Sequence, residues 1–111
     1  MEAINEFICI AKCDVSLIAG SQQVEVTSPF VVISSSDVSS SINSIVTGLE
    51  YSEEYSGDRD RCFSIRILNR SGNPISIENG NILTQNGEDF ILQNNSSCTI
   101  VYDGTSYILT M

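Results

Sequence analysis

The sequence predicts an all-β protein: an antiparallel β-sandwich or barrel-like domain with a C-terminal β-meander and one short helix. Short runs of β-branched and apolar residues recur along the 111 residues, as expected for strands separated by turns. Charged residues make up only 17% of the chain, below the roughly 25% typical of soluble domains. Asn-Gly or Asp-Gly dipeptides at 79–80, 86–87 and 103–104 suit tight hairpin turns. The length fits a single β-rich domain over residues 1–111.

The N-terminal half, residues 1–56, begins as a series of short strands. Residues 7–11 form an apolar run that suits a buried strand, and 15–19, 24–27 and 30–33 are further short β-branched stretches. Pro29 has no N–H to donate to a ladder, so it places the strand that it opens at a sheet edge or at that strand's first residue.

Residues 37–49 carry a different pattern, because apolar side chains recur there at spacings of three and four. This spacing predicts one face of a helix, with Asp37 as its N-cap. The serines at 39–41 argue against it, since serine has only modest helix propensity. The next residues, 50–61, are polar and aperiodic, and we expect an exposed loop that divides the two halves. The residues of the helical pattern are Val38, Ile42, Ile45, Val46 and Leu49.

In the C-terminal half, residues 62–111, the sequence pattern predicts a strand at 62–69, a turn at 71–74 and then the meander. Two-residue turns at the three dipeptides would pair residue 77 with 82, 83 with 90, 100 with 107 and 98 with 109. One face of these strands is then apolar, and it serves either as core or as a subunit interface. The candidate residues of this face are Ile75, Ile77, Ile82, Leu83, Phe90, Leu92, Ile100, Tyr102, Tyr107 and Leu109.

The absence of histidine removes the Ser-His-Asp and Cys-His nucleophile pairs together with imidazole acid–base chemistry. No glycine-rich phosphate loop is present either. Acid pairs occur at 53–54 and at 58 and 60, but a solvated loop is the simpler interpretation, with calcium binding there as a weak alternative. We therefore expect no enzyme, no catalytic residue and no cofactor.

The cysteines Cys9, Cys13, Cys62 and Cys98 have the wrong spacing for a zinc knuckle. In a reducing compartment they act most simply as small buried apolar residues. The acidic N-terminus lacks the positive charge of a signal peptide, and no apolar run has the length of a membrane span. These features predict synthesis in a cytoplasm and no membrane partner.

The formal net charge is −9, from 14 acidic and 5 basic residues. No basic patch is available to neutralise a run of phosphates, so direct nucleic-acid binding is not expected. Solubility is the simplest explanation of the acidity.

In the C-terminal half, the segments 65–77, 81–83, 89–92 and 97–109 alternate short apolar strands with Gly-, Asn- and Ser-rich turns. They close on an Asp-Gly-Thr-x-aromatic hairpin at 103–107, in which Tyr107 stands where such hairpins often have Trp. This half resembles a module at the ends of bacteriophage fibre, tail and head-decoration proteins. The resemblance implies a homotrimeric virion building block, with other copies of itself and major capsid or tail proteins as partners. Its location would then be the virion.

Two other functions remain open. The charge of −9 and the acidic stretch 50–60 suit a small acidic inhibitor that blocks a host nucleic-acid enzyme, although a DNA mimic would concentrate its acids more. A carbohydrate- or receptor-binding module is the second alternative. Tyr51 and Tyr55 could form a platform for it, although a pair of tyrosines more often packs onto its own domain.

Overall fold

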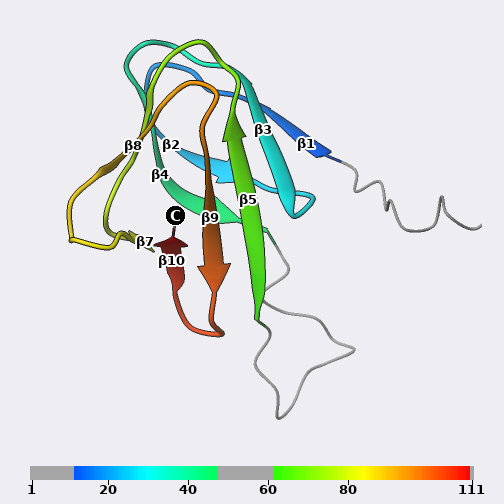
Figure 1. Cartoon of the computed structure of the whole chain (residues 1–111), viewed down its shortest axis with the longest axis vertical. Coiled ribbons are helices and arrows are strands. Elements are labelled where there is room, and N and C mark those ends of the chain that lie inside the picture. The colour runs from blue at the N-terminus through cyan, green and yellow to red at the C-terminus, as the bar shows by residue number, and fades with distance from the viewer. Residues whose placement is uncertain (1–11, 48–61, 111) are drawn as a thin grey trace, which may run out of the picture.

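The computed structural model describes residues 12–47 and 62–110, which form ten strands in two sheets and contain no helix. Sheet A has the strand order β1-β3-β5-β9-β10-β7, and sheet B has the order β2-β4-β6-β8. In Figure 1, β5 and β9 of sheet A cross in front of β2 and β4 of sheet B. The strands are β1 (Lys12–Ser16), β2 (Gly20–Glu25), β3 (Phe30–Ser35), β4 (Ser40–Val46), β5 (Phe63–Asn69), β6 (Ile75–Ile77), β7 (Ile82–Leu83), β8 (Phe90–Leu92), β9 (Ser97–Tyr102) and β10 (Tyr107–Thr110).

The all-β prediction is confirmed, but the sheets are mixed and not antiparallel. From β1 to β6 the chain passes from one sheet to the other after every strand. Each return to a sheet therefore runs in the original direction, so β1, β3 and β5 are parallel neighbours in sheet A. In sheet B, β2, β4 and β6 are parallel in the same way. Local turn signals do not reveal this, because they mark where a strand ends and not which sheet the next strand joins.

The chain reverses direction only in its last part. β8 pairs antiparallel with β6 in sheet B, and β9 pairs antiparallel with β5 in sheet A. β10 then returns antiparallel to β9 and pairs on its other side with the two-residue strand β7, in parallel. The edge strands at this end, β7 and β8, are short, whereas the edge strands at the other end, β1 and β2, have five and six residues.

The predicted meander from residue 75 is therefore wrong except for its last hairpin. Ile82 lies beside Tyr107 and not Ile77, and Phe90 lies beside Ile77 and not Leu83. Side chains hold these two turns in other shapes. The Asn79 Oδ1 atom accepts hydrogen bonds from the Thr84 N–H and hydroxyl, and the Asn86 Oδ1 atom accepts one from the Glu88 N–H. Both Asn-Gly dipeptides thus turn the chain between sheets and do not close hairpins.

The β9–β10 hairpin forms, but its loop has four residues, 103–106, and not two. The Asp103 Oδ1 atom accepts hydrogen bonds from the N–H groups of Thr105 and Ser106 at 2.9 and 2.8 Å, which stabilises the longer loop. Tyr107 consequently faces Tyr102, and Leu109 faces Ile100. The predicted pairs of residue 100 with 107 and of 98 with 109 are wrong by two residues. A shift of two keeps each side chain on its predicted face.

The predicted helix at 37–49 is wrong in its described part, because residues 40–46 form strand β4. Asp37 caps a turn, and its Oδ1 atom accepts a hydrogen bond from the Ser39 N–H. The register of β4 against β2 slips at Asn43, so that Gln22 lies beside Ile42 and Gln23 beside Ser44. This β-bulge adds one residue and places the buried Ile42 and Ile45 three positions apart. A strand with a bulge can therefore show the three-residue spacing of buried side chains that is typical of a helix.

The core lies between the two sheets and is lined by both halves of the chain. One buried polar side chain, Asn69 at 0% exposed, connects the layers, because its Nδ2 group on β5 donates to the Leu92 carbonyl oxygen on β8 at 2.9 Å. The predicted strands at 62–69 and 30–33 are confirmed with shifted ends, and β3 begins directly after Pro29. Those at 15–19 and 24–27 are only partly right, because β1 ends at Ser16 and β2 spans Gly20–Glu25. The predictions for 7–11, for 50–61 and for Leu49 lie outside the described residues. The largest fully buried side chains are Ile33, Ile42, Ile65, Ile67, Ile75, Ile77, Ile82, Leu92, Ile100, Leu109, Val26 and Val31.

Candidate functional site

The ten candidate face residues divide into core and partly exposed positions. Six of them, Ile75, Ile77, Ile82, Leu92, Ile100 and Leu109, are at most 1% exposed and lie between the sheets of one chain. Phe90, Tyr102 and Tyr107 are half-buried, and Leu83 is 44% exposed. The N-terminal half supplies much of the cover for this face, through β1 to β4.

Tyr102 and Tyr107 belong to an aromatic cluster with Phe63 at the end of the core. The centroids of the two tyrosine rings are 4.9 Å apart, and Phe63 lies 5.1 and 6.2 Å from Tyr102 and Tyr107. The Tyr102 hydroxyl donates to the Gly104 carbonyl oxygen at 3.1 Å. This cluster ties the 103–106 loop to β5 and β9, which explains its position without a ligand.

A second apolar surface lies on the opposite side of the same strands, and we call it the outer face of sheet A. Because side chains alternate along a strand, the neighbours of the buried β3, β5, β9 and β10 residues point away from the core. One row across the sheet contains Lys12, Phe30, Arg66, Thr99 and Thr110, and the next contains Asp14, Val32, Leu68 and Ser97. A third row contains Ser64, Val101, Ile108 and Leu83.

The apolar members of this face are half-buried or exposed. Leu83 is exposed, and the others each keep part of their surface accessible. A solvated face of a sheet usually alternates to polar residues, so a group of this kind is typical of a surface that meets a partner. The group consists of Phe30, Val32, Leu68, Leu83, Val101 and Ile108.

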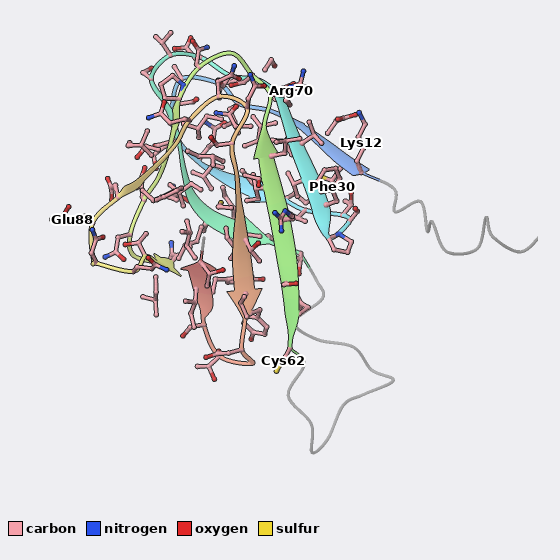
Figure 2. All side chains as sticks on the ribbon, in the orientation of Figure 1. Lys12, Phe30, Cys62, Arg70 and Glu88 are labelled. Atoms are coloured by element: carbon pink, nitrogen blue, oxygen red, sulfur yellow. The ribbon has the colours of Figure 1, made fainter. Side chains whose placement is uncertain are left out.

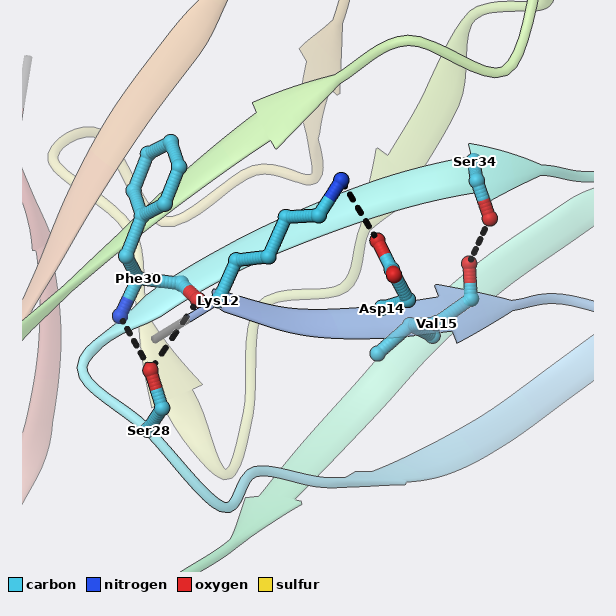
Figure 3. Close-up of polar contacts among 6 residues, drawn as sticks. All are labelled: Lys12, Asp14, Val15, Ser28, Phe30 and Ser34. Atoms are coloured by element: carbon cyan, nitrogen blue, oxygen red, sulfur yellow. Dashed lines mark hydrogen bonds and ion pairs between the residues drawn. The ribbon is translucent and has the colours of Figure 1, made fainter. Parts of the chain in front are cut away.

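Figure 3 shows how the first row begins on β1 and β3. The Phe30 N–H donates to the Ser28 hydroxyl at 3.2 Å, and this hydroxyl donates to the Phe30 carbonyl oxygen. These two hydrogen bonds hold the backbone of Phe30 at the start of β3, and so set the position of its ring. Beside it, the Lys12 ammonium lies 3.5 Å from an Asp14 carboxylate oxygen, with both side chains more than half exposed. Such an exposed pair contributes only about 0–1 kcal/mol to stability.

The charge on this face has the opposite sign to the charge of the whole chain. It holds Lys12 and Arg66 against the single acid Asp14, whereas the chain carries −9. In residues 12–47 and 62–110, no ion pair involves Arg66. The face is therefore slightly basic on an acidic protein.

A hollow of about 430 Å³ lies near β8, on another part of the surface. Its lining includes the polar Thr84, Asn86 and Asp89 and the apolar Phe90, Ile91 and Leu109. Glu88 precedes Asp89 in the same loop, and both are exposed.

The cysteines that the structure describes do not come together. Cys13 and Cys98 are buried and Cys62 is exposed. Cys13, Val31, Ile67 and Cys98 form one row across four strands of sheet A, which separates the two buried thiols by about 14 Å. Burial raises the pKa of the Cys98 thiol to about 11, so it remains protonated near neutral pH. In the described ranges no three Cys, Asp or Glu side chains gather around a metal position.

The carboxylates with shifted pKa values are stabilised as anions. Hydrogen bonds from the Ser21 and Ser41 hydroxyls lower the pKa of Glu78, and hydrogen bonds from the Ser106 and Thr105 backbone lower that of Asp103. A general acid would need the opposite shift. The acid pairs at 53–54 and 58–60, together with Tyr51, Tyr55 and Cys9, lie outside the described residues.

The fold and this face define an all-β protein of two mixed sheets with an apolar, slightly basic outer surface. No helix in the described part of the chain is long and apolar enough to cross a membrane. No protein-family model matches the chain, and comparisons with curated proteins and with solved structures also find no match.

The outer face of sheet A is a candidate site that the sequence pattern alone does not predict. The meander assigned this side of the last two strands mainly to Ser97, Thr99, Ser106 and Thr110. The sequence does contain one indication of this face. Val101 and Ile108 are apolar, yet they alternate with the core residues and therefore point to the opposite side of the sheet. Phe30, Val32 and Leu68 join them only when β3 and β5 become parallel neighbours.

Proposed function

We propose that this protein is a non-enzymatic structural component of a bacteriophage virion, a capsid decoration or fibre-type protein that assembles as a homotrimer. The outer face of sheet A is the observation that carries the proposal. The Phe, two Leu, two Val and one Ile side chains on this sheet face keep part of their surface accessible, and the chain gains free energy when that surface is buried. The resemblance of the C-terminal half to phage fibre and head-decoration modules supplies the virion context.

A structural role suits the chemistry of this face as well. Its side chains are aliphatic groups, one aromatic ring and hydroxyls, with only three charges in the rows. Such a surface excludes water over a broad area when another protein covers it. The middle row, with Arg66 and Thr99, is mostly polar, and the aliphatic side chains lie in the rows on either side of it. Protein–protein contacts also combine apolar and polar groups.

The first experiment is light scattering coupled to size exclusion on the purified full-length chain, over a hundredfold range of concentration. A mass of three chains supports the proposal, and a monomer at every concentration contradicts its assembly part.

Co-sedimentation tests the virion part independently, with purified phage capsids or tails from which accessory proteins have been stripped. Saturable binding of the wild-type chain supports a virion component, and absence of binding to both particles contradicts it. An inhibitor of a host nucleic-acid enzyme would instead lower nuclease or polymerase activity in a salt-sensitive manner.

A further inference from the structure

We infer that Asn86 is a modification site, at which the folded protein loses the side-chain amide and gains a carboxylate. The reaction needs no enzyme, because the backbone nitrogen of Gly87 attacks the carbonyl carbon of the Asn86 side chain. A following glycine favours this attack, since it places no side chain beside the nitrogen. The chemistry belongs to the single chain and does not depend on the assembly proposed above.

The reaction passes through a succinimide ring. The Gly87 nitrogen loses its proton to water and forms a bond to the Asn86 Cγ atom, while the bond from Cγ to the amide nitrogen breaks. The amide nitrogen takes up a proton and leaves as ammonia. Water then opens the ring at either carbonyl carbon, which yields an aspartate or an isoaspartate at position 86. The net change consumes one water and releases one ammonia.

The chain has two Asn-Gly dipeptides, at 79–80 and 86–87, and both are accessible. Asn79 and Asn86 are exposed. Both glycines have open space beside them, because a Cβ added at either would meet no atom within 4 Å. Accessibility therefore does not distinguish the two sites, whereas their hydrogen bonds do.

At Asn79, hydrogen bonds engage both groups that would have to react. The Gly80 N–H donates to the Ile82 carbonyl oxygen at 3.1 Å, so the attacking nitrogen is held. The Asn79 Oδ1 atom accepts hydrogen bonds from the Thr84 N–H and hydroxyl at 3.0 and 3.1 Å, which hold the side chain toward Thr84. The Asn79 N–H also donates to an Asp89 carboxylate oxygen at 2.9 Å. Ring closure at this site would break several of these bonds, which raises its barrier.

At Asn86, the attacking nitrogen is available and the side chain is held beside it. Within residues 12–47 and 62–110, no hydrogen bond engages the Gly87 N–H. The Asn86 Oδ1 atom accepts a hydrogen bond from the Glu88 N–H at 3.2 Å, which is the contact of an Asx turn. This turn folds the side chain over the Gly87 peptide, so that ring closure requires little rearrangement.

The product adds a negative charge to a loop that is already acidic. Glu88 and Asp89 follow in the chain, and Asn86 and Asp89 both line the hollow near β8. Figure 2 shows Glu88 at the edge of the molecule, on the loop that leads to β8. Conversion therefore makes the hollow more acidic, and the converted fraction increases with the age of the protein.

Peptide mapping by mass spectrometry tests the inference on the purified full-length chain, incubated at mildly alkaline pH with and without urea. Cleavage after glutamate places Asn79 and Asn86 in one peptide, 79–88, and its fragment ions separate them. In the folded chain Asn86 should convert about tenfold or more faster than Asn79, because only Asn79 must first break its hydrogen bonds to Thr84 and that of Gly80. In urea the two should convert at similar rates, since glycine follows both.

Two serine variants provide a matched comparison. Asn86→Ser removes the reactive amide, and its hydroxyl can still accept the Glu88 N–H in the same kind of turn. Asn79→Ser removes the other amide. The wild-type chain and Asn79→Ser should accumulate an acidic species on anion-exchange chromatography, whereas Asn86→Ser should not. Circular dichroism verifies that each variant is folded.

Three results would overturn the inference. The first is absence of conversion at Asn86, or equal conversion of Asn79 and Asn86, in the folded chain. The second is an Asn86→Ser variant that accumulates the acidic species as fast as the wild type. The third is a difference between the two sites that persists in urea, because it would then come from the local sequence and not from the fold.

Discussion

The outer faces of the two sheets differ in chemistry although their inner faces are alike. Both sheets line the core with buried Ile, Val and Leu. Outside, sheet A carries the aliphatic and aromatic group around Leu68, whereas sheet B carries a row with Ser21, Ser41 and Ser76. The inner positions of a strand are constrained by the core, and the outer ones are free to take up a function.

Several polar side chains on sheet B bond one another, although its outer side also carries the exposed Val46 and Ile91. The Ser41 hydroxyl donates to a Glu78 carboxylate oxygen at 2.6 Å, and the Asn43 Nδ2 group donates to the Ser21 hydroxyl at 2.8 Å. The apolar side chains of sheet A cannot form such hydrogen bonds. Their exposure to water costs a free energy of about 25 cal/mol per Å² of apolar surface.

Asn69→Ala should have the largest effect, because it breaks the link between the two sheets. The change leaves the Leu92 and Asn73 carbonyl oxygens and the Ser71 N–H without their amide partner. We expect a loss of about 2–4 kcal/mol in the free energy of unfolding, measured by urea denaturation. Ser64→Ala, on the outer side of the same strand, is the control. A loss below about 1 kcal/mol would show that the sheets are held by apolar packing alone.

Leu68→Ser makes sheet A resemble sheet B, and its main effect should be on self-association. Removing a half-buried leucine from an interface costs about 1–2 kcal/mol, which corresponds to a dissociation constant raised about five- to thirtyfold. Sedimentation equilibrium measures this constant. An unchanged constant would contradict the role of the outer face of sheet A.

Low pH should weaken the polar network of sheet B. Hydrogen bonds lower the pKa of Glu78 below its ordinary value of 4.5 in the folded chain. This contribution to stability is present above the ordinary pKa and is lost as the pH falls through the lowered one. Urea denaturation between neutral pH and the acid range should therefore show a shallower acid dependence for Glu78→Gln than for the wild type. Equal slopes would exclude this network as a source of stability.

Ser76→Val makes the outer side of sheet B more apolar, and it should have the smallest effect on stability and assembly. Ser76 is half-buried in the middle of sheet B, and valine suits a strand at least as well as serine. The free energy of unfolding should change by no more than about 0.5 kcal/mol, and the assembled mass should stay the same. A change in light-scattering mass would mean that sheet B also takes part in assembly.

The sequence was informative about which residues are buried and less so about how strands pair. Alternation placed Ile75, Ile77, Ile100 and Leu109 on one apolar side, and all four are core residues. Pairing depends on contacts between distant segments, such as Phe30 beside Arg66, which no local dipeptide encodes.

The candidate site could not be predicted because it is assembled from such contacts. Phe30, Leu68 and Val101 are separated in the chain, and they share one face only because β5 pairs in parallel with β3 and antiparallel with β9. The bulge at Asn43 is unpredictable for a related reason, since it depends on the register of β4 against β2.

The alternation of strands between sheets also makes the chain modular. Each pair of successive strands, such as β1 with β2 or β3 with β4, adds one strand to sheet A and one strand to sheet B. The connection from β2 to β3 covers residues 26–29, whereas that from β4 to β5 covers 47–62, yet both lead to the same kind of parallel neighbour. Such a chain can lengthen a connection between modules, or duplicate a module, and keep every existing strand in register.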